Sequence, residues 1–193
     1  GTAVGMLVIN ALLKKFNARI LYIASGIYSV CANIIAFTIG YFYFTTDNKV
    51  LMFAFIACLF LIGLQFGASN LLPLMFQADV LEDLELQTGK RLDASLPFVI
   101  SIGTLISGTI ASTVAPFILK GENSLIHYEQ LANGAISDGT DKIALLFFYT
   151  IVHGIMMFLA GAPFFFYKLT GKAKEETHEK VLEMRAANTK NTK

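Results

Sequence analysis

The chain has 193 residues, of which 55% are hydrophobic and only 15% are charged, and its mean hydropathy is +0.61. Soluble domains carry about 25% charged residues, so this composition excludes an ordinary soluble domain. The net charge of +1 argues against a nucleic-acid partner.

Charged residues are absent from four long segments of the chain. No Asp, Glu, Lys or Arg occurs in 20–46, 50–78, 97–119 or 143–167, which are 27, 29, 23 and 25 residues long. About 20 apolar residues in a helix cross a bilayer, so each segment is predicted to be a transmembrane helix. Residues 1–13 are apolar but too short to span, and we interpret them as the end of a truncated transmembrane helix. The sequence therefore predicts an all-α membrane protein, a polytopic bundle of transmembrane helices.

The connections between these segments differ in their basic residues. Twelve Lys and Arg residues fall before 20, in 79–96 and in 168–193, whereas three fall in the other connections, which include 120–142. Basic residues concentrate on the cytoplasmic side of membrane proteins. This bias predicts a cytoplasmic charged loop at 79–96, an external loop at 120–142 and a cytoplasmic tail at 168–193. Within the tail, 172–187 suits a helix, either as a solvated extension of the last span or lying on the lipid surface.

Several polar side chains lie inside the predicted spans. An unpaired amide in lipid is costly, so such groups should face protein or water. The candidate cavity-lining residues are Gln65, Asn70, Thr104 and Ser107. Simple close packing inside a bundle is the alternative for the last two, because small residues recur every four positions there, at Gly103, Ser107, Ala111 and Ala115.

Three further features of the spans suggest packing. Asn33 is expected to face the interior of the bundle, and the pattern Gly63-x-x-x-Gly67 is a packing signal of low specificity. His153 is the one titratable group at membrane depth. It is predicted either to hydrogen-bond to a neighbouring helix or to relay protons.

Motifs of catalysis are not found in the sequence. It has no glycine-rich phosphate loop, no His and Cys residues at metal-ligand spacing and no pair of carboxylates at membrane depth. We therefore expect neither an enzyme nor a cofactor. Cys31 and Cys58 lie within apolar segments and are predicted to face lipid or to pack.

The acid-then-base segment ADVLEDLELQTGKR at 78–91 resembles a signature of the glycoside–pentoside–hexuronide:cation symporters, a melibiose-carrier-like branch of the major facilitator superfamily. Glu82 keeps the acid of that signature but not its length, Asp83 replaces a Tyr, and Gln87 replaces a Lys. The tail resembles the family's Lys- and Glu-rich ending. The matching residues are Leu72, Pro73, Ala78, Asp79, Glu85, Thr88, Gly89, Lys90 and Arg91.

The resemblance covers the whole chain and implies the end of helix 8 and helices 9 to 12 of a twelve-helix transporter, that is, a partial C-terminal half. It implies cation-coupled symport of a sugar or related small solute by alternating access in a plasma (inner) membrane. The coupling cation, Na⁺ or H⁺, is expected to bind in a missing N-terminal half of the same polypeptide, and the other partners are the solute and the lipid bilayer. Many sugar-transporting members of that family carry a Lys midway along helix 11, and this chain has no Lys near Thr104 and Leu105. This departure leaves open a lysolipid-type transporter, and a non-catalytic membrane module is a further alternative.

The charged segment has two interpretations. It is either a solvated loop that sets topology, or a gate at the inner mouth whose ionic pairs form with each other or with the other half of the protein. The residues of this gating motif are Asp79, Glu82, Asp83, Glu85, Lys90 and Arg91.

Overall fold

The computed structural model describes all residues of the chain except 47, 91–93, 120–125, 127–139 and 192–193, and only the backbone of 188–191. The regular elements among the described residues are all helical, which confirms the predicted fold class. In chain order they are α1 (Thr2–Leu13), α2 (Ala18–Thr46), α3 (Lys49–Thr88), α4 (Ser95–Leu119), α6 (Thr140–Phe147), the π-helical turn η1 (Phe148–Val152), α7 (His153–Gly161), the 3₁₀ turn η2 (Ala162–Phe165) and α8 (Lys172–Asn191).

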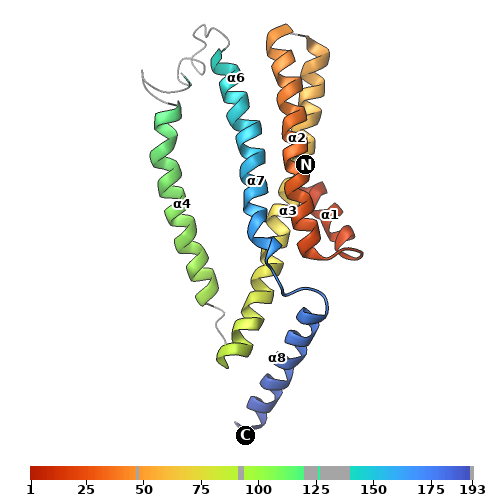
Figure 1. The fold of residues 1–193 in the computed structure, drawn as a ribbon, viewed down its shortest axis with the longest axis vertical. Coiled ribbons are helices and arrows are strands. Elements are labelled where there is room, and N and C mark those ends of the chain that lie inside the picture. The colour runs from red at the N-terminus through yellow and green to blue at the C-terminus, as the bar shows by residue number, and fades with distance from the viewer. Residues whose placement is uncertain (47, 91–93, 120–125, 127–139, 192–193) are drawn as a thin grey trace.

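Four helical segments are long and apolar enough to cross a membrane, as the charge-free segments predicted. They are Ala18–Thr46, Lys49–Thr88, Ser95–Leu119 and Thr140–Phe165, and the last combines α6, η1, α7 and η2. Helix α2 packs against both α3 and α7. Figure 1 shows the axes of these helices roughly aligned, with α2 and α3 running in opposite chain directions and the short α1 crossing beside α3.

The short helix α1 packs on α3 through glycines on both helices. A Cβ atom added to Gly5 would lie 2.0 Å from the carbonyl oxygen of Leu64, and one added to Gly67 would lie 2.3 Å from the carbonyl carbon of Gly5. Gly1 faces Gly63 in the same way, at 2.7 Å from its Cα. The two backbones therefore touch, which only small residues permit. The predicted packing role of Gly63 and Gly67 is confirmed, and its partner is a second Gly-x-x-x-Gly at the start of the chain.

Helix α3 is longer than predicted, and the expected loop at 79–96 is wrong over 79–88. The helix begins at an Asn48 cap, whose side chain accepts from the Val50 amide at 2.9 Å, and it continues to Thr88. It ends at Gly89, where φ is 67° and the amide donates to the Glu85 carbonyl. The charged residues 79–88 include no Gly or Pro, so nothing in the backbone ends the helix earlier. The helix therefore carries its acidic residues beyond the apolar span.

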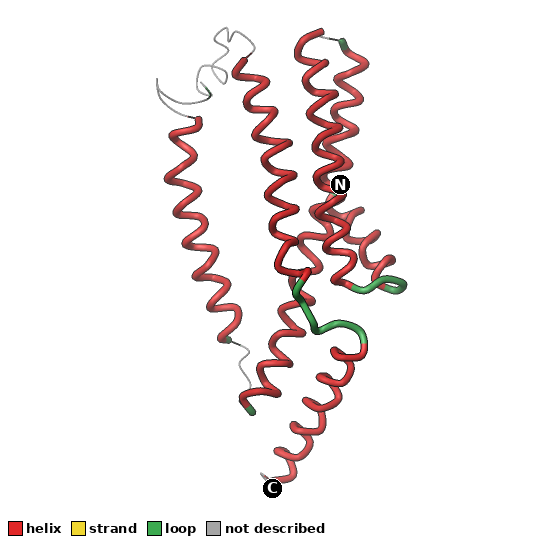
Figure 2. The backbone as a smooth tube through the Cα atoms, viewed as in Figure 1, coloured by secondary structure: helices red, strands yellow, loops and turns green. Residues whose placement is uncertain are grey.

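The tail folds as a helix, as predicted, but not as an extension of the last span. The span ends at Phe165, the segment 166–171 forms no regular helix, and α8 begins at Lys172. Helix α8 then contacts α3. Figure 2 shows the segment as a loop that turns the chain back toward the lower end of α3.

Helix α4 buries none of its residues against the rest of the described chain. A Cβ atom on Gly103 or Gly108 would meet no atom within 4 Å. The ridge of small residues on α4 thus packs against none of the described helices, and Figure 1 shows α4 standing apart.

The glycine contact between α1 and α3 gives a test of the fold. Gly67→Ala should lower the free energy of unfolding by about 1–3 kcal/mol, because the new methyl group would overlap the α1 backbone. The measurement is thermal unfolding of the protein in a neutral detergent. The matched control Gly103→Ala has open space around it and should change stability little. Equal effects of the two variants would contradict the close approach of α1 and α3.

Candidate functional site

The acidic end of α3 presents three carboxylates on successive turns. Asp79, Glu82 and Glu85 are three residues apart, so each is a surface neighbour of the next. Asp79 and Glu85 are buried, at 8% and 6% exposure. A buried carboxylate needs a partner of opposite charge, because removing it from water is costly.

The partners come from one face of α8. Lys174, His178, Val181 and Arg185 are spaced by four, three and four residues, which places them on a single stripe of a helix. Val181, in the middle of this stripe, is fully buried. The spacing of this stripe can be read from the sequence. Its role cannot be read from charge pairs within the tail, because the residues that it pairs with lie about 100 positions away on α3.

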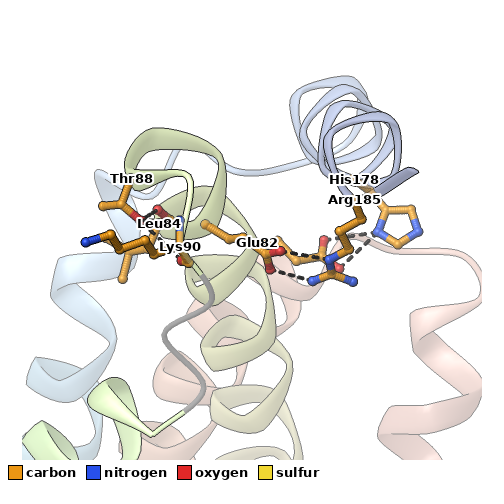
Figure 3. Close-up of polar contacts among 7 residues, drawn as sticks. Glu82, Leu84, Thr88, Lys90, His178 and Arg185 are labelled. Atoms are coloured by element: carbon orange, nitrogen blue, oxygen red, sulfur yellow. Dashed lines mark hydrogen bonds and ion pairs between the residues drawn. The ribbon is translucent and has the colours of Figure 1, made fainter. Parts of the chain in front are cut away.

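The three carboxylates pair with the stripe in chain order. Lys174 Nζ lies 2.7 Å from Asp79 Oδ1, and His178 Nδ1 lies 3.0 Å from Glu82 Oε1. Arg185 donates from Nε to Glu85 Oε1 at 2.8 Å and from its terminal nitrogen to Oε2, a bidentate arrangement. Figure 3 shows His178 and Arg185 reaching from α8 toward the carboxylates of α3. We call these six residues the α3–α8 clasp.

Tyr167, just beyond the last span, adds a hydrogen bond to the clasp. Its hydroxyl donates to Asp79 Oδ2 at 3.3 Å. Burial, and then the negative charge of Asp79, raise the pKa of Tyr167 above its usual value. The phenol therefore remains protonated and a donor at physiological pH, and Asp79 is held by two groups, Tyr167 and Lys174.

The other residues of the predicted gating motif lie outside the clasp. Asp83 accepts from Gln87 on its own helix at 2.6 Å. Lys90 is exposed and contacts Thr88 only through its backbone, and no carboxylate of a described residue lies within 4.0 Å of its side chain. Figure 3 shows Lys90 away from the pairs that Glu82 and Arg185 form. Arg91 lies outside the described residues. Asp79, Glu82 and Glu85 therefore pair with the tail rather than with Lys90.

Gln65 lies in a buried polar cluster between α2 and α3. Its Oε1 accepts from Ser29 at 3.2 Å, and its Nε2 donates to Ser69 at 3.2 Å. Asn33 joins the cluster by donating to the Ser29 carbonyl at 2.8 Å. Gln65 also borders an apolar cavity of about 250 Å³ between α1, α2 and α3. The expectation that Asn33 and Gln65 face protein is confirmed.

Two buried polar atoms of the described residues have no hydrogen-bond partner, Asn33 Oδ1 and His153 Nε2. His153 makes no interhelical hydrogen bond to any described residue; its ring packs at a tilt of 36° against Phe66 of α3, with centroids 5.5 Å apart. Asn33 packs over the backbone of α7, since a Cβ atom on Gly154 would lie 3.0 Å from its Cβ. The predicted hydrogen bond of His153 to a neighbouring helix is therefore wrong.

The four predicted cavity residues do not gather around one cavity. Asn70 is exposed, and Thr104 and Ser107 lie on α4, where every hydroxyl bonds back to its own helix or is exposed. Thr104, for example, donates to the Ile100 carbonyl at 2.9 Å. Only Gln65 of the four is buried and next to a cavity. For Thr104 and Ser107 the reason is that α4 buries no residue against the described helices, whereas Asn70 lies on an exposed face of α3.

Comparison with known families identifies the class of protein. The family model of the MFS/sugar transport proteins matches residues 1–171. The chain belongs to this family. It is therefore a transporter of the major facilitator superfamily, and its described helices are part of such a helical bundle. A search of curated proteins and a search of solved structures found no match.

The residues that match the family model include one side of the clasp but not the other. The acidic end of α3 lies within the matched residues, whereas α8 begins at Lys172, just after them. The basic half of the clasp in this transporter is thus contributed by a segment outside the family model.

The burial of the clasp carboxylates gives a prediction about stability. Arg185→Gln should destabilise the docked tail by about 1–3 kcal/mol, because it leaves the buried Glu85 without its main partner. Glu85→Gln should destabilise the docked tail less than Arg185→Gln does, because it removes the buried negative charge itself. Hydrogen exchange of the α8 amides in detergent measures both effects. The exposed Lys180→Gln on the same helix is the control and should leave exchange unchanged. If Arg185→Gln behaves like this control, Glu85 does not depend on α8.

Proposed function

We propose that the protein is a secondary active transporter that couples movement of a sugar or related small solute to a cation by alternating access. Membership of the MFS/sugar transport family supports transport, and the resemblance of 78–91 to the cation symporter signature supports coupling. The single structural observation that carries the proposal is the α3–α8 clasp, which gives the signature acids Asp79 and Glu85 defined partners.

The clasp fits a role in gating. In alternating access the halves of a transporter rock around a site near the midplane, and contacts at each mouth close and open in turn. An exposed ion pair contributes about 0–1 kcal/mol, whereas the burial of Asp79 and Glu85 makes loss of a partner more costly. We propose that the clasp holds the end of α3 in a fixed position, from which Lys90 and Arg91 form pairs with the opposing half.

The remaining parts of the proposal concern ion, partner and location. The coupling cation is Na⁺ or H⁺ and binds in an N-terminal half of the same polypeptide, which also supplies the opposing wall for α4. No cofactor takes part. The protein lies in a plasma (inner) membrane with its C-terminus in the cytoplasm, because the connections on that side carry most of the basic residues.

A lysolipid is the alternative substrate. The absence of a Lys near Thr104 supports this alternative, because the family that 78–91 resembles has a Lys at that place in many of its sugar-transporting members. Transport of a lysolipid would still require alternating access and the same clasp.

The substrate is tested with the full-length protein reconstituted in liposomes. Uptake of a labelled galactoside and of a labelled lysophospholipid is measured with an inward Na⁺ gradient, with an inward H⁺ gradient and with neither. The proposal expects uptake of the galactoside to be stimulated by one of the gradients. If neither gradient stimulates uptake of either compound, coupled transport of both is refuted.

The gating role is tested by separating rate from binding. Asp79→Asn and Arg91→Gln should each lower the maximal transport rate about tenfold while substrate affinity changes little, since a tenfold change corresponds to about 1.4 kcal/mol in the conformational step. Equilibrium substrate binding and initial uptake rates supply the two readouts. Glu179→Gln, an exposed α8 variant outside the clasp, is the control. Normal transport by Asp79→Asn would exclude the clasp from the mechanism, and normal transport by Arg91→Gln would exclude the proposed pairing of Arg91 with the opposing half.

A further inference from the structure

Two connections of the chain meet at the same end of the bundle as the clasp. One is the turn between α1 and α2, and the other is the segment 166–171 between η2 and α8. The Arg19 guanidinium at the start of α2 donates to the Phe165 carbonyl at 2.5 Å. Leu13 and Phe164, which flank the two connections, pack against one buried cluster that includes Phe76. Figure 2 shows both connections as loops on the same side of the molecule.

The basic residues of this junction form no ion pair with any described residue. Residues 1–46 and 143–174 contain no Asp or Glu. Among the described residues, no carboxylate lies within 4.0 Å of any of its basic groups, in contrast to Lys174 and Arg185 of the clasp. The basic residues of the junction are Lys14, Lys15, Arg19, Lys168 and Lys172.

Large exposed apolar side chains lie close in the sequence to these basic residues. Phe16 lies next to Lys15 and is 50% exposed, Ile20 next to Arg19 is 58% exposed, and Phe166 is 82% exposed. The membrane-spanning segments begin at Ala18 and end at Phe165, so these groups lie where acyl chains meet lipid headgroups. A ligand that matches this surface has a negative head and an apolar body.

We propose that the junction of the α1–α2 turn and the 166–171 segment is a binding site for an anionic glycerophospholipid. The phosphodiester lies among Lys15, Arg19 and Lys168, and the acyl chains lie against Phe16 and Ile20. Basic groups beside a membrane span attract anionic lipids with about 1 kcal/mol each. Because Arg19 is already held by Phe165, its charge is positioned before the lipid arrives.

The experiment is native mass spectrometry of the protein in neutral detergent with added lipid. Dioleoyl phosphatidylglycerol and dioleoyl phosphatidylcholine have the same acyl chains and differ in headgroup charge. The proposal expects preferential retention of phosphatidylglycerol. It also expects Lys15→Gln and Lys168→Gln each to weaken this binding about fivefold, which is 1 kcal/mol converted to an equilibrium constant. Both lysines are exposed, so neither change removes a packing contact.

Matched controls separate a site from diffuse attraction. Lys180→Gln on α8 and Lys49→Gln at the start of α3 make the same change of charge at exposed positions away from the junction, and both should leave lipid retention unchanged. Equal retention of the two lipids, or equal weakening by the control variants, would overturn the proposal. Displacement of phosphatidylglycerol by equimolar inorganic phosphate would also overturn it, because the site would then recognise phosphate alone rather than a lipid.

Discussion

Polar groups that leave water must find partners inside the protein, and this constraint accounts for most of the architecture. At the end of α3 it explains why the buried carboxylates Asp79 and Glu85 are met by a separate helix from the tail. Deeper in the bundle it explains why Ser29 and Gln65 hydrogen-bond between α2 and α3. In both places one helix supplies acceptors and another supplies donors, so the polar groups specify which helices are neighbours.

The spans were predictable because hydropathy is a local property. The continuation of α3 was predictable too, because residues 79–88 contain no Gly or Pro, and the loop predicted from the onset of charge at Asp79 is wrong there. Charge marks the end of the apolar segment and not the end of the helix, which requires a residue such as Gly89 with its positive φ. The clasp required knowledge of a contact between residues about 100 positions apart, which a single sequence does not contain.

The candidate site was only partly predictable for a related reason. Polarity within a span indicates that a side chain avoids lipid, but it does not say what the side chain faces. Gln65 fulfils the expectation because α2 covers it, whereas Asn70, five residues further along the helix, is exposed. Thr104 and Ser107 share a helix that no described element covers. The described residues therefore do not define what Thr104 and Ser107 face.

The clasp and the basic junction are mechanically connected through the short segment 166–171. Arg19 fixes the beginning of this segment at Phe165, and Lys174 fixes the first turn of α8 on Asp79. Lys168 lies between these two points and has no carboxylate partner among the described residues. A ligand bound at Lys168 would restrict the segment that determines where α8 begins. The lipid environment and the gate would then act on the same few residues, which follows from the geometry without any contact between lipid and clasp.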